Sequence, residues 1–324
     1  MPMTNINGKI SVSGPATSDA PLYVHPAFVA VNHKTEFIKP VHVDQSSLCN
    51  PRLFEVKDGV ARHIGKLLPL THSEIQKLSQ YFFSSTDIRF LIFEDIVLEG
   101  ECDDPATYKR QRFRYQANWH RTLNTGDQYL SNQQRRSLGR KMRKLEESLG
   151  SEPEHVFRPA SSDDIDLVAE MNRKTVESRG GGYKLTDQKK DRLKAICEQL
   201  GFSSMLVHKG RVIAGDIICM TGHHAYFPLV GYDAEFSKYS PGLFLHTKSL
   251  DVCVARGCIE AHFLWGDSRW KSDLGAQRQP LDTIVVSKSH WDWIRPTGIE
   301  LFAPHAVKSI KRWLSRALKQ SSFG

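Results

Sequence analysis

The sequence predicts an α+β protein, an α/β sandwich in which helices cover a mixed β-sheet. The evidence is three successive candidate strands, a capped helix and a further strand, over residues 202–208, 211–220, 225–232, 241–257 and 258–265. Aromatic and β-branched residues favour strands in the first three segments. This β-β-β-α-β order implies an antiparallel meander, followed by a crossover. The two strands that flank the crossover should be parallel, and the connection between them right-handed.

The crossover helix has a clear start signal. Ser240 is a good N-cap residue, Pro241 stands at the first helical position, and Gly257 is a natural stop. Free N–H groups after Pro241 lie at the positive end of the helix and can bind phosphate, and Gly242 lets an anion approach the backbone. An ordinary capped helix with nothing bound explains the same segment.

Composition narrows the class of protein. The chain has 324 residues, 40% of them hydrophobic, which is enough for two domains or one large one. Its net charge of +8 and isoelectric point near 9.1 suit anionic partners, such as a CoA phosphate, an acidic glycan or nucleic acid. Six scattered cysteines make neither a zinc pattern nor a disulfide framework. We therefore expect a reduced, cytoplasmic protein without a signal peptide or transmembrane segment.

The chain divides into four parts. We expect a disordered tail over residues 1–25, an N-terminal half over 26–130, a basic connector helix over 131–150 and a C-terminal domain over 151–324. The N-terminal half contains a hairpin, a capped helix and buried strands, in an order that resembles a shortened copy of the later segments. This order indicates a degenerate internal repeat.

Two segments of the first half support this division. Asp58-Gly59 is a strong turn signal between two candidate strands. Residues 112–123 alternate between polar and apolar side chains, which favours an edge strand.

The connector helix is strongly basic. Ser131 and Gln134 form a capping box, and Gly150 ends the helix. Its basic residues are Arg135, Arg136, Arg140, Lys141, Arg143 and Lys144. A solvated surface helix and a contact with an anionic donor or acceptor both explain this cluster.

Several motifs occur in the order seen in one family. An aromatic strand ends in Gly231-Tyr232-Asp233, the helix starts at 239–242, and a second strand ends before Gly266-Asp267, Trp270 and Lys271. This set resembles the CelD-like (cellulose biosynthesis type) acyltransferases of the GNAT superfamily, which are related to Fem-type aminoacyl transferases. The tryptophan stands where many members have tyrosine. The resemblance covers roughly residues 128–300 and implies a GNAT-type sheet with a second, degenerate GNAT-like half at the N-terminus.

The resemblance implies acyl-CoA, acetyl-CoA above others, as co-substrate. Its thioester and pantetheine would bind backbone amides where two parallel strands splay apart, here at Leu229, Val230 and Gly231. Its pyrophosphate would bind the amides at the helix start. The residues of that start are Tyr239, Ser240, Pro241, Gly242 and Leu243.

The acceptor amine or hydroxyl would attack the thioester directly, so no enzyme nucleophile is needed. In this scheme Asp267 orients or deprotonates the acceptor, Lys271 binds an anionic group, and Tyr232 protonates the departing thiolate. Trp270 and Arg140 would contact the substrate. Each residue also has an ordinary structural role, as a turn residue, a solvated charge or a cover of the core.

Other classes of site lack support. The sequence has no GxSxG, HExxH or phosphate-binding-loop motif and no zinc-finger or RNA-recognition motif. His223 and His224 have no carboxylate or cysteine at ligand spacing, so no metal site is expected.

The resulting hypothesis is a bacterial acyltransferase that modifies a glycan, peptide or amine acceptor in cell-envelope or exopolysaccharide biosynthesis. Two alternatives remain. A Fem-like enzyme would take an aminoacyl group from charged tRNA, with the basic helix meeting the RNA. A catalytically silent GNAT fold would serve as a regulatory or nucleic-acid-binding module.

Overall fold

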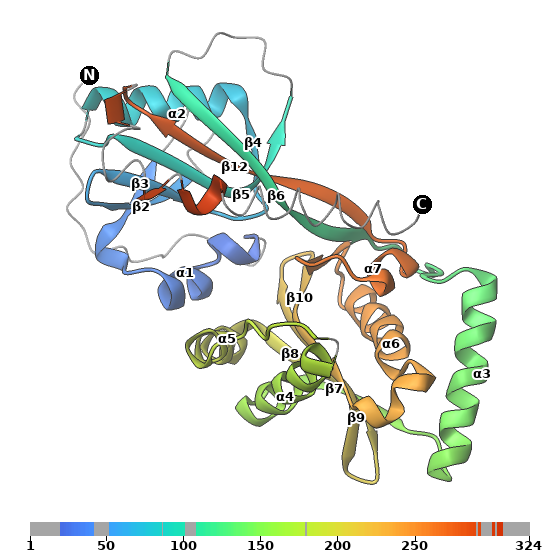
Figure 1. Ribbon diagram of the computed structural model, residues 1–324. Helices are drawn as coiled ribbons and strands as arrows, with labels where there is room; N and C mark the ends of the chain where they lie inside the picture. The colour runs from blue at the N-terminus through green and yellow to red at the C-terminus, as the bar shows by residue number, and fades with distance from the viewer. Residues whose placement is uncertain are drawn as a thin grey trace.

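A single mixed sheet runs through the described part of the molecule. The computed structural model describes residues 20–41, 52–85, 87–100, 108–178, 180–289, 291–292, 300–301 and 303–306. The strand order is β1-β2-β3-β5-β12-β6-β11-β10-β9-β8-β7, with β4 paired to β5. Figure 1 shows two lobes joined by the long strands β6 and β12. The predicted α+β class with a mixed sheet is confirmed.

The first lobe is built mainly from the N-terminal part of the chain. Its strands are β1 (Ile38–Val41), β2 (Arg52–Lys57), β3 (Val60–Ile64), β4 (Pro69–Thr71), β5 (Phe90–Glu99) and β6 (Lys109–Thr122). Its helical segments are η2 (Leu22–Val24), α1 (Pro26–Asn32), η3 (Thr35–Phe37) and α2 (His72–Ser85). Asp58 and Gly59 both have positive φ angles and close the predicted β2–β3 hairpin. The helix α2 then connects β3 to the parallel strand β5.

The second lobe has the predicted β-β-β-α-β core. Its strands are β7 (Glu154–Pro159), β8 (Gly201–His208), β9 (Arg211–Thr221), β10 (His224–Tyr232) and β11 (Glu260–Leu264). Its helical segments are α3 (Asn132–Leu149), α4 (Ser162–Ser178), α5 (Asp187–Leu200), η5 (Ala234–Tyr239), α6 (Pro241–Ala255) and α7 (Arg269–Asp273). β8, β9 and β10 form an antiparallel meander, and α6 leads to β11, which is parallel to β10.

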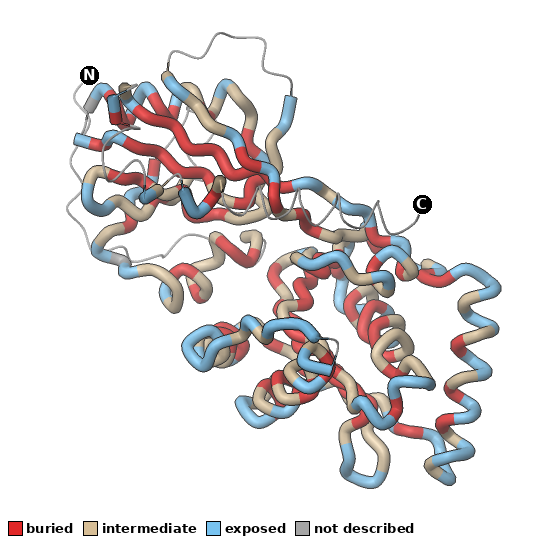
Figure 2. Tube along the Cα trace, in the orientation of Figure 1, coloured by how far each residue is buried: buried red, intermediate tan, exposed pale blue. Residues whose placement is uncertain are grey.

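Helices cover both faces of the second lobe, as Figure 1 shows. α4 and α5 lie on one face, where Ile165, Val168 and Ile196 join a core cluster with β9 and β10. α6 and α3 lie on the other face, where Leu250 and Leu138 pack against β10 and β11. In Figure 2 the strands between these layers are largely buried, whereas the outer side of α3 is exposed. None of the helices among the described residues is long and apolar enough to cross a membrane.

The prediction that residues 112–123 form an edge strand is wrong. β6 lies inside the sheet, where it pairs with β12 (Gln277–Ser287) and, through its last residues, with β11. Arg112 and Arg114 both bind the carboxylate of Asp282 on β12, with Nε–Oδ1 distances of 2.6 and 3.0 Å. Asp282 is only 2% exposed, whereas the Arg112 and Arg114 side chains are 45% and 51% exposed, so the two arginines of β6 cover and neutralise a buried carboxylate on β12.

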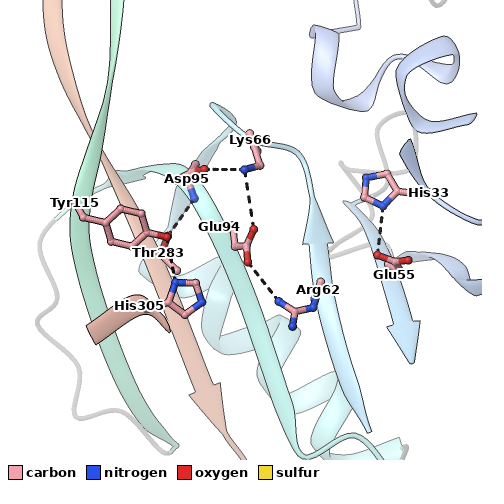
Figure 3. A network of polar contacts seen from close by, with 9 residues as sticks. All are labelled: His33, Glu55, Arg62, Lys66, Glu94, Asp95, Tyr115, Thr283 and His305. Carbon is pink, nitrogen blue, oxygen red and sulfur yellow. Dashed lines mark hydrogen bonds and ion pairs between the residues drawn. The ribbon is translucent and has the colours of Figure 1, made fainter. Parts of the chain in front are cut away.

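One strand from the second half of the sequence lies in the first lobe. β12 belongs to the expected domain over 151–324, yet it lies between β5 and β6. Figure 3 shows the polar network that anchors it: Asp95 N–H donates to Thr283 Oγ1, which contacts the Tyr115 hydroxyl, and that hydroxyl lies 3.1 Å from His305 Nδ1. Lys66 completes the network by binding Asp95 at 2.8 Å.

The N-terminal segment packs against the second lobe, whereas β12, from late in the chain, lies in the first lobe. Residues 1–19 of the expected tail lie outside the described residues, whereas Leu22 and Tyr23, which were expected to be disordered, pack against the second lobe. Leu22 and Tyr23 are 3% and 7% exposed and belong to the core cluster of α4, α5 and β10. The Leu22 N–H donates to the Tyr226 hydroxyl at 3.4 Å. The first lobe therefore contains a late segment of the chain, and the core of the second lobe contains an early one.

We predict that Gly231→Ala lowers the free energy of unfolding by about 1–3 kcal/mol, because overpacking forces backbone shifts. A Cβ at Gly231 would lie 2.7 Å from the Val168 carbonyl oxygen and 3.0 Å from the Asn172 nitrogen, both on α4. Gly242→Ala is the matched control, since its Cβ would meet only the Tyr232 ring at 3.4 Å. Urea unfolding measures both variants, and equal stabilities would contradict the close α4–β10 packing.

Candidate functional site

Two parallel strands part at the centre of the second lobe. The β10–β11 pairing covers only 224–226 against 260–262, although β10 continues to Tyr232. A bulge between Tyr226 and Leu229 shifts the register of β10 against β9, and such bulges bend a strand. β10 and β11 therefore separate after the Tyr226–His262 pair. Leu229, Val230 and Gly231, the residues predicted to contact pantetheine, follow this opening.

The start of α6 differs from the prediction in one respect. Ser240 holds the N-cap position, but its φ of 58° and ψ of 45° are left-handed and its side chain does not cap the helix. Its hydroxyl instead accepts a hydrogen bond from Lys141 Nζ on α3 at 2.9 Å. The segment before it is the 3-10 helix η5, which Asp233 caps. The first N–H groups of α6 are thus not covered by the Ser240 side chain, and a lysine lies beside them.

Further groups surround the same helix start. Gly242 faces Tyr232, the last residue of β10, so the end of the strand and the start of α6 are in contact. Hydrogen bonds from Ser148 and Lys238, together with nearby lysine charges, lower the pKa of Tyr239. The structure therefore brings the predicted pyrophosphate-binding segment together with Tyr232 in an electropositive setting. Arg140 is exposed on α3, one residue before Lys141.

Lys271 is buried and fully hydrogen-bonded. Its Nζ donates to the carbonyls of Phe263, Leu264 and Trp265 at 2.7, 3.1 and 2.7 Å, and an ammonium group has three donors. Burial lowers the pKa of Lys271 to about 8. These bonds hold the end of β11, where Leu264 has a φ of 55°. The side chain expected to bind an anionic substrate group thus organises the backbone beside the opening.

Asp267 and Trp270 lie on either side of this strand end. Asp267 Oδ1 accepts from Trp119 Nε1 on β6 at 3.1 Å and from Arg278 Nε on β12 at 3.4 Å. The Trp270 ring lies 4.3 Å from His246 of α6. The predicted residues therefore form two groups, one around the end of β10 and the start of α6, the other at the end of β11.

A cluster of polar side chains that no sequence motif indicates lies on the paired part of β10 and β11 and on β6. We call His120, His224, Glu260 and His262 the histidine–glutamate cluster. Glu260 Oε1 lies 2.6 Å from His120 Nδ1, and Glu260 Oε2 lies 3.4 Å from His224 Nδ1. His224 Nδ1 and His262 Nε2 are 3.2 Å apart. These residues come from β6, β10 and β11, so no local spacing in the sequence points to them.

The charges of this cluster are set by burial and by hydrogen bonding. Burial lowers the pKa of His262 to about 4, so this imidazole is neutral at physiological pH. Hydrogen bonds from His120 and His224 hold the pKa of Glu260 far below its usual range. Tyr226 stacks on His262 with a ring separation of 4.5 Å and an angle of 11°. A fixed carboxylate thus faces imidazole nitrogens.

Three residues of this cluster form a candidate metal-binding group that the spacing in the sequence did not indicate. His224, Glu260 and His262 offer ligand atoms that all lie within 4.8 Å of one another. His223, the other half of the histidine pair noted in the sequence, is exposed and contacts the Gly257 carbonyl at 2.9 Å.

We predict that Lys271→Met lowers the free energy of unfolding at pH 7 by about 3 kcal/mol or more, because three buried carbonyls lose a charged donor. Lys288→Met, at an exposed lysine, serves as the control.

Comparison of wild type with Lys271→Met at several pH values tests the pKa of Lys271. This pKa is about 8 in the folded protein, against the ordinary lysine value of 10.5. Between these values the unfolded chain keeps a proton that the native chain has lost, so native stability rises with pH. The difference in unfolding free energy between wild type and Lys271→Met should therefore grow from pH 8 to pH 10. A flat difference would contradict the lowered pKa.

Comparison with known proteins identifies a protein family whose model matches part of this chain. Residues 132–272 match the model of the acetyltransferase (GNAT) domain. No curated protein matches the chain.

Several solved structures resemble the chain at low identity. FemX is 9% identical, with a TM-score of 0.48 over 72% of this chain and 83% of that chain. L-PGS from Bacillus licheniformis is 12% identical, with a TM-score of 0.46 over 80% and 86%. A conserved protein of unknown function from Bacteroides thetaiotaomicron is 10% identical, with a TM-score of 0.49 over 73% and 82%. These resemblances do not bear on the reaction, the donor or the acceptor. The family match supports the GNAT-type fold, and residues 132–272, from α3 to α7, are the part of the chain that resembles the acetyltransferase (GNAT) domain.

Proposed function

We propose that the protein transfers an acyl group from acyl-CoA, with acetyl-CoA the preferred donor, to an amine or hydroxyl of an acceptor. The observation that carries this proposal is the opening between β10 and β11, with the start of α6 at the end of β10. Both features lie within the segment that matches the GNAT domain. A strand edge and a helix N-terminus offer backbone donors to an extended ligand that ends in phosphates.

The donor has a continuous path in this proposal. Pantetheine lies along 229–231, where β10 has left its parallel partner. The pyrophosphate lies at 239–243, where the positive end of the α6 dipole and the ammonium group of Lys141 favour negative charge. The contact between Tyr232 and Gly242 keeps these two parts adjacent.

Catalysis then depends on positioning and on stabilisation of charge rather than on a covalent intermediate. Tyr232 is proposed to protonate the departing thiolate, since it stands between the strand and the pyrophosphate site. Asp267 is proposed to orient the acceptor from a turn that Trp119 and Arg278 hold in place. Lys271 acts as a positioning residue, because its three hydrogen bonds define the end of β11. Trp270 covers this end and leaves Asp267 exposed.

An anionic acceptor fits the charge of the molecule. The net charge is +8, and the exposed basic side chains of α3 adjoin the α6 start. A precursor of a cell-envelope glycan or exopolysaccharide is the acceptor class that we propose on this basis.

Donor binding is tested by thermal unfolding with acetyl-CoA, longer acyl-CoAs and free CoA. A ligand at 100 times its dissociation constant should stabilise the protein by ~2.7 kcal/mol. Gly242→Leu should abolish this effect by filling the helix start, whereas Gly242→Ala should retain most of it. Release of CoA thiol in the presence of amine or sugar acceptors measures the transfer. The absence of both stabilisation and thiol release would contradict the proposal.

The exposed basic face of α3 also favours a second candidate, aminoacyl transfer from charged tRNA. In this case tRNA binding should weaken steeply with salt, and Arg140→Glu with Arg143→Glu should reduce the salt dependence. Lys209→Glu, in the exposed β8–β9 turn, is the control for net charge. If acyl-CoA is the donor instead, added tRNA should leave thiol release from acetyl-CoA unchanged, and tRNA should bind weakly at physiological salt.

A further inference from the structure

We infer that the histidine–glutamate cluster binds a divalent transition-metal ion, with His224 Nδ1, His262 Nε2 and Glu260 Oε2 as its ligands. This site goes beyond the proposed acyl transfer and does not depend on it. Two imidazoles and one carboxylate are a ligand set used for Zn²⁺ and for non-haem Fe²⁺ in proteins. Such sites keep further coordination positions open to water or another ligand.

The spacing of the three atoms fits one ion. His224 Nδ1 lies 3.2 Å from His262 Nε2 and 3.4 Å from Glu260 Oε2, and the third side of the triangle is 3.8 Å. Tetrahedral Zn²⁺ with bonds of 2.0–2.2 Å places neighbouring ligand atoms about 3.3–3.6 Å apart. An ion can therefore enter with shifts of only a few tenths of an ångström.

Rigid strands hold the ligands in this arrangement. His224 is opposite Glu260 and Tyr226 is opposite His262 in the parallel β10–β11 register. Residues two apart on a strand share a face, so all four side chains project to the same side of the sheet. The ion would link the first pair of the β10–β11 ladder, His224 and Glu260, to His262 in the last pair before the strands separate.

Neighbouring groups orient the ligands as in known metal sites. His120 Nδ1 lies 2.6 Å from Glu260 Oε1, which leaves Oε2 directed to the two other histidines. The Asn118 amide lies 3.1 Å from His262 Nδ1, and Asn118 is completely buried with its Oδ1 lacking a hydrogen-bond partner.

An asparagine amide can present either its oxygen or its nitrogen to a neighbour. With the oxygen facing His262, Nδ1–H would donate to it, and Nε2 would keep a free lone pair for the ion. The unpartnered oxygen of Asn118 would then be satisfied. The stacked ring of Tyr226 prevents His262 from rotating away.

Access to the site is open. The side chains of His224 and Glu260 are 29% and 27% exposed, whereas that of His262 is 9% exposed. An ion can reach the cluster from solvent, and a water molecule can occupy an open position on the exposed side.

Metal binding is measured directly on the full chain. The protein is stripped with EDTA, dialysed and titrated with Zn²⁺ by calorimetry, with Co²⁺ by visible absorption and with Fe²⁺ under anaerobic conditions. We expect one ion per chain and the intense Co²⁺ bands of a low-symmetry protein site. The relative affinities for Zn²⁺ and Fe²⁺ show which ion the site prefers.

Variants assign the ligands. Glu260→Gln and His224→Gln should each weaken Zn²⁺ binding more than a hundredfold, and His120→Gln should weaken it about tenfold, as expected of a group that orients a ligand. His223→Gln, at the exposed neighbouring histidine, should bind Zn²⁺ like wild type. The two ligand positions are partly exposed, so these variants should fold, which circular dichroism and thermal unfolding without metal can verify.

The site is overturned if wild type and Glu260→Gln bind Zn²⁺ equally, or if binding is lost only in His223→Gln. The cluster would then be a metal-free hydrogen-bonded group. Thermal unfolding with acetyl-CoA, repeated on the stripped protein, separates this result from the proposed function. Stabilisation by acetyl-CoA without metal would leave acyl transfer intact, whatever the titration shows.

Discussion

The position of β6 inside the sheet is the constraint on which the rest of the molecule depends. This 14-residue strand pairs with β12 along most of its length and with β11 at its end. It thereby joins the sheets of two lobes and brings Trp119 and His120 to the end of β11. The buried contact of Arg112 and Arg114 with Asp282 stabilises the join, since a carboxylate left there without both partners would be costly to bury.

The opening at the candidate site follows from a competition within β10. The strand must pair with β9 along its whole length and with the parallel β11 at its beginning. The bulge after Tyr226 lets β10 continue to pair with β9 and coincides with the end of its pairing with β11. The backbone groups at 229–231 therefore have no partner on β11. Lys271 has the opposite effect on β11, because it fixes three successive carbonyls where the strand ends. On one side of the opening β10 bends at its bulge, and on the other side the hydrogen bonds from Lys271 hold the end of β11.

The candidate site could be predicted only in part. Pro241 and Gly242 stand at a helix start that local signals indicate, so the segment proposed to bind the donor could be located from the sequence. The roles of Lys271 and Ser240 were not, because each depends on a contact that spacing does not show: three carbonyls at the end of β11, and a lysine on α3. The histidine–glutamate cluster was invisible for a stronger reason, since His120 and Glu260 are far apart in the chain and meet through strand pairing.

The sequence by itself determined the local elements: the capping box of α3, the turn at Asp58-Gly59, the β8–β10 meander and the α6 crossover. These depend on φ preferences, caps and periodicity, which act within a few residues. The tertiary structure alone decided that β6 is an interior strand, that β12 returns to the first lobe and that Leu22 and Tyr23 join the second. Those outcomes depend on burial and on charge pairing between segments more than a hundred residues apart, and no short-range pattern encodes such contacts.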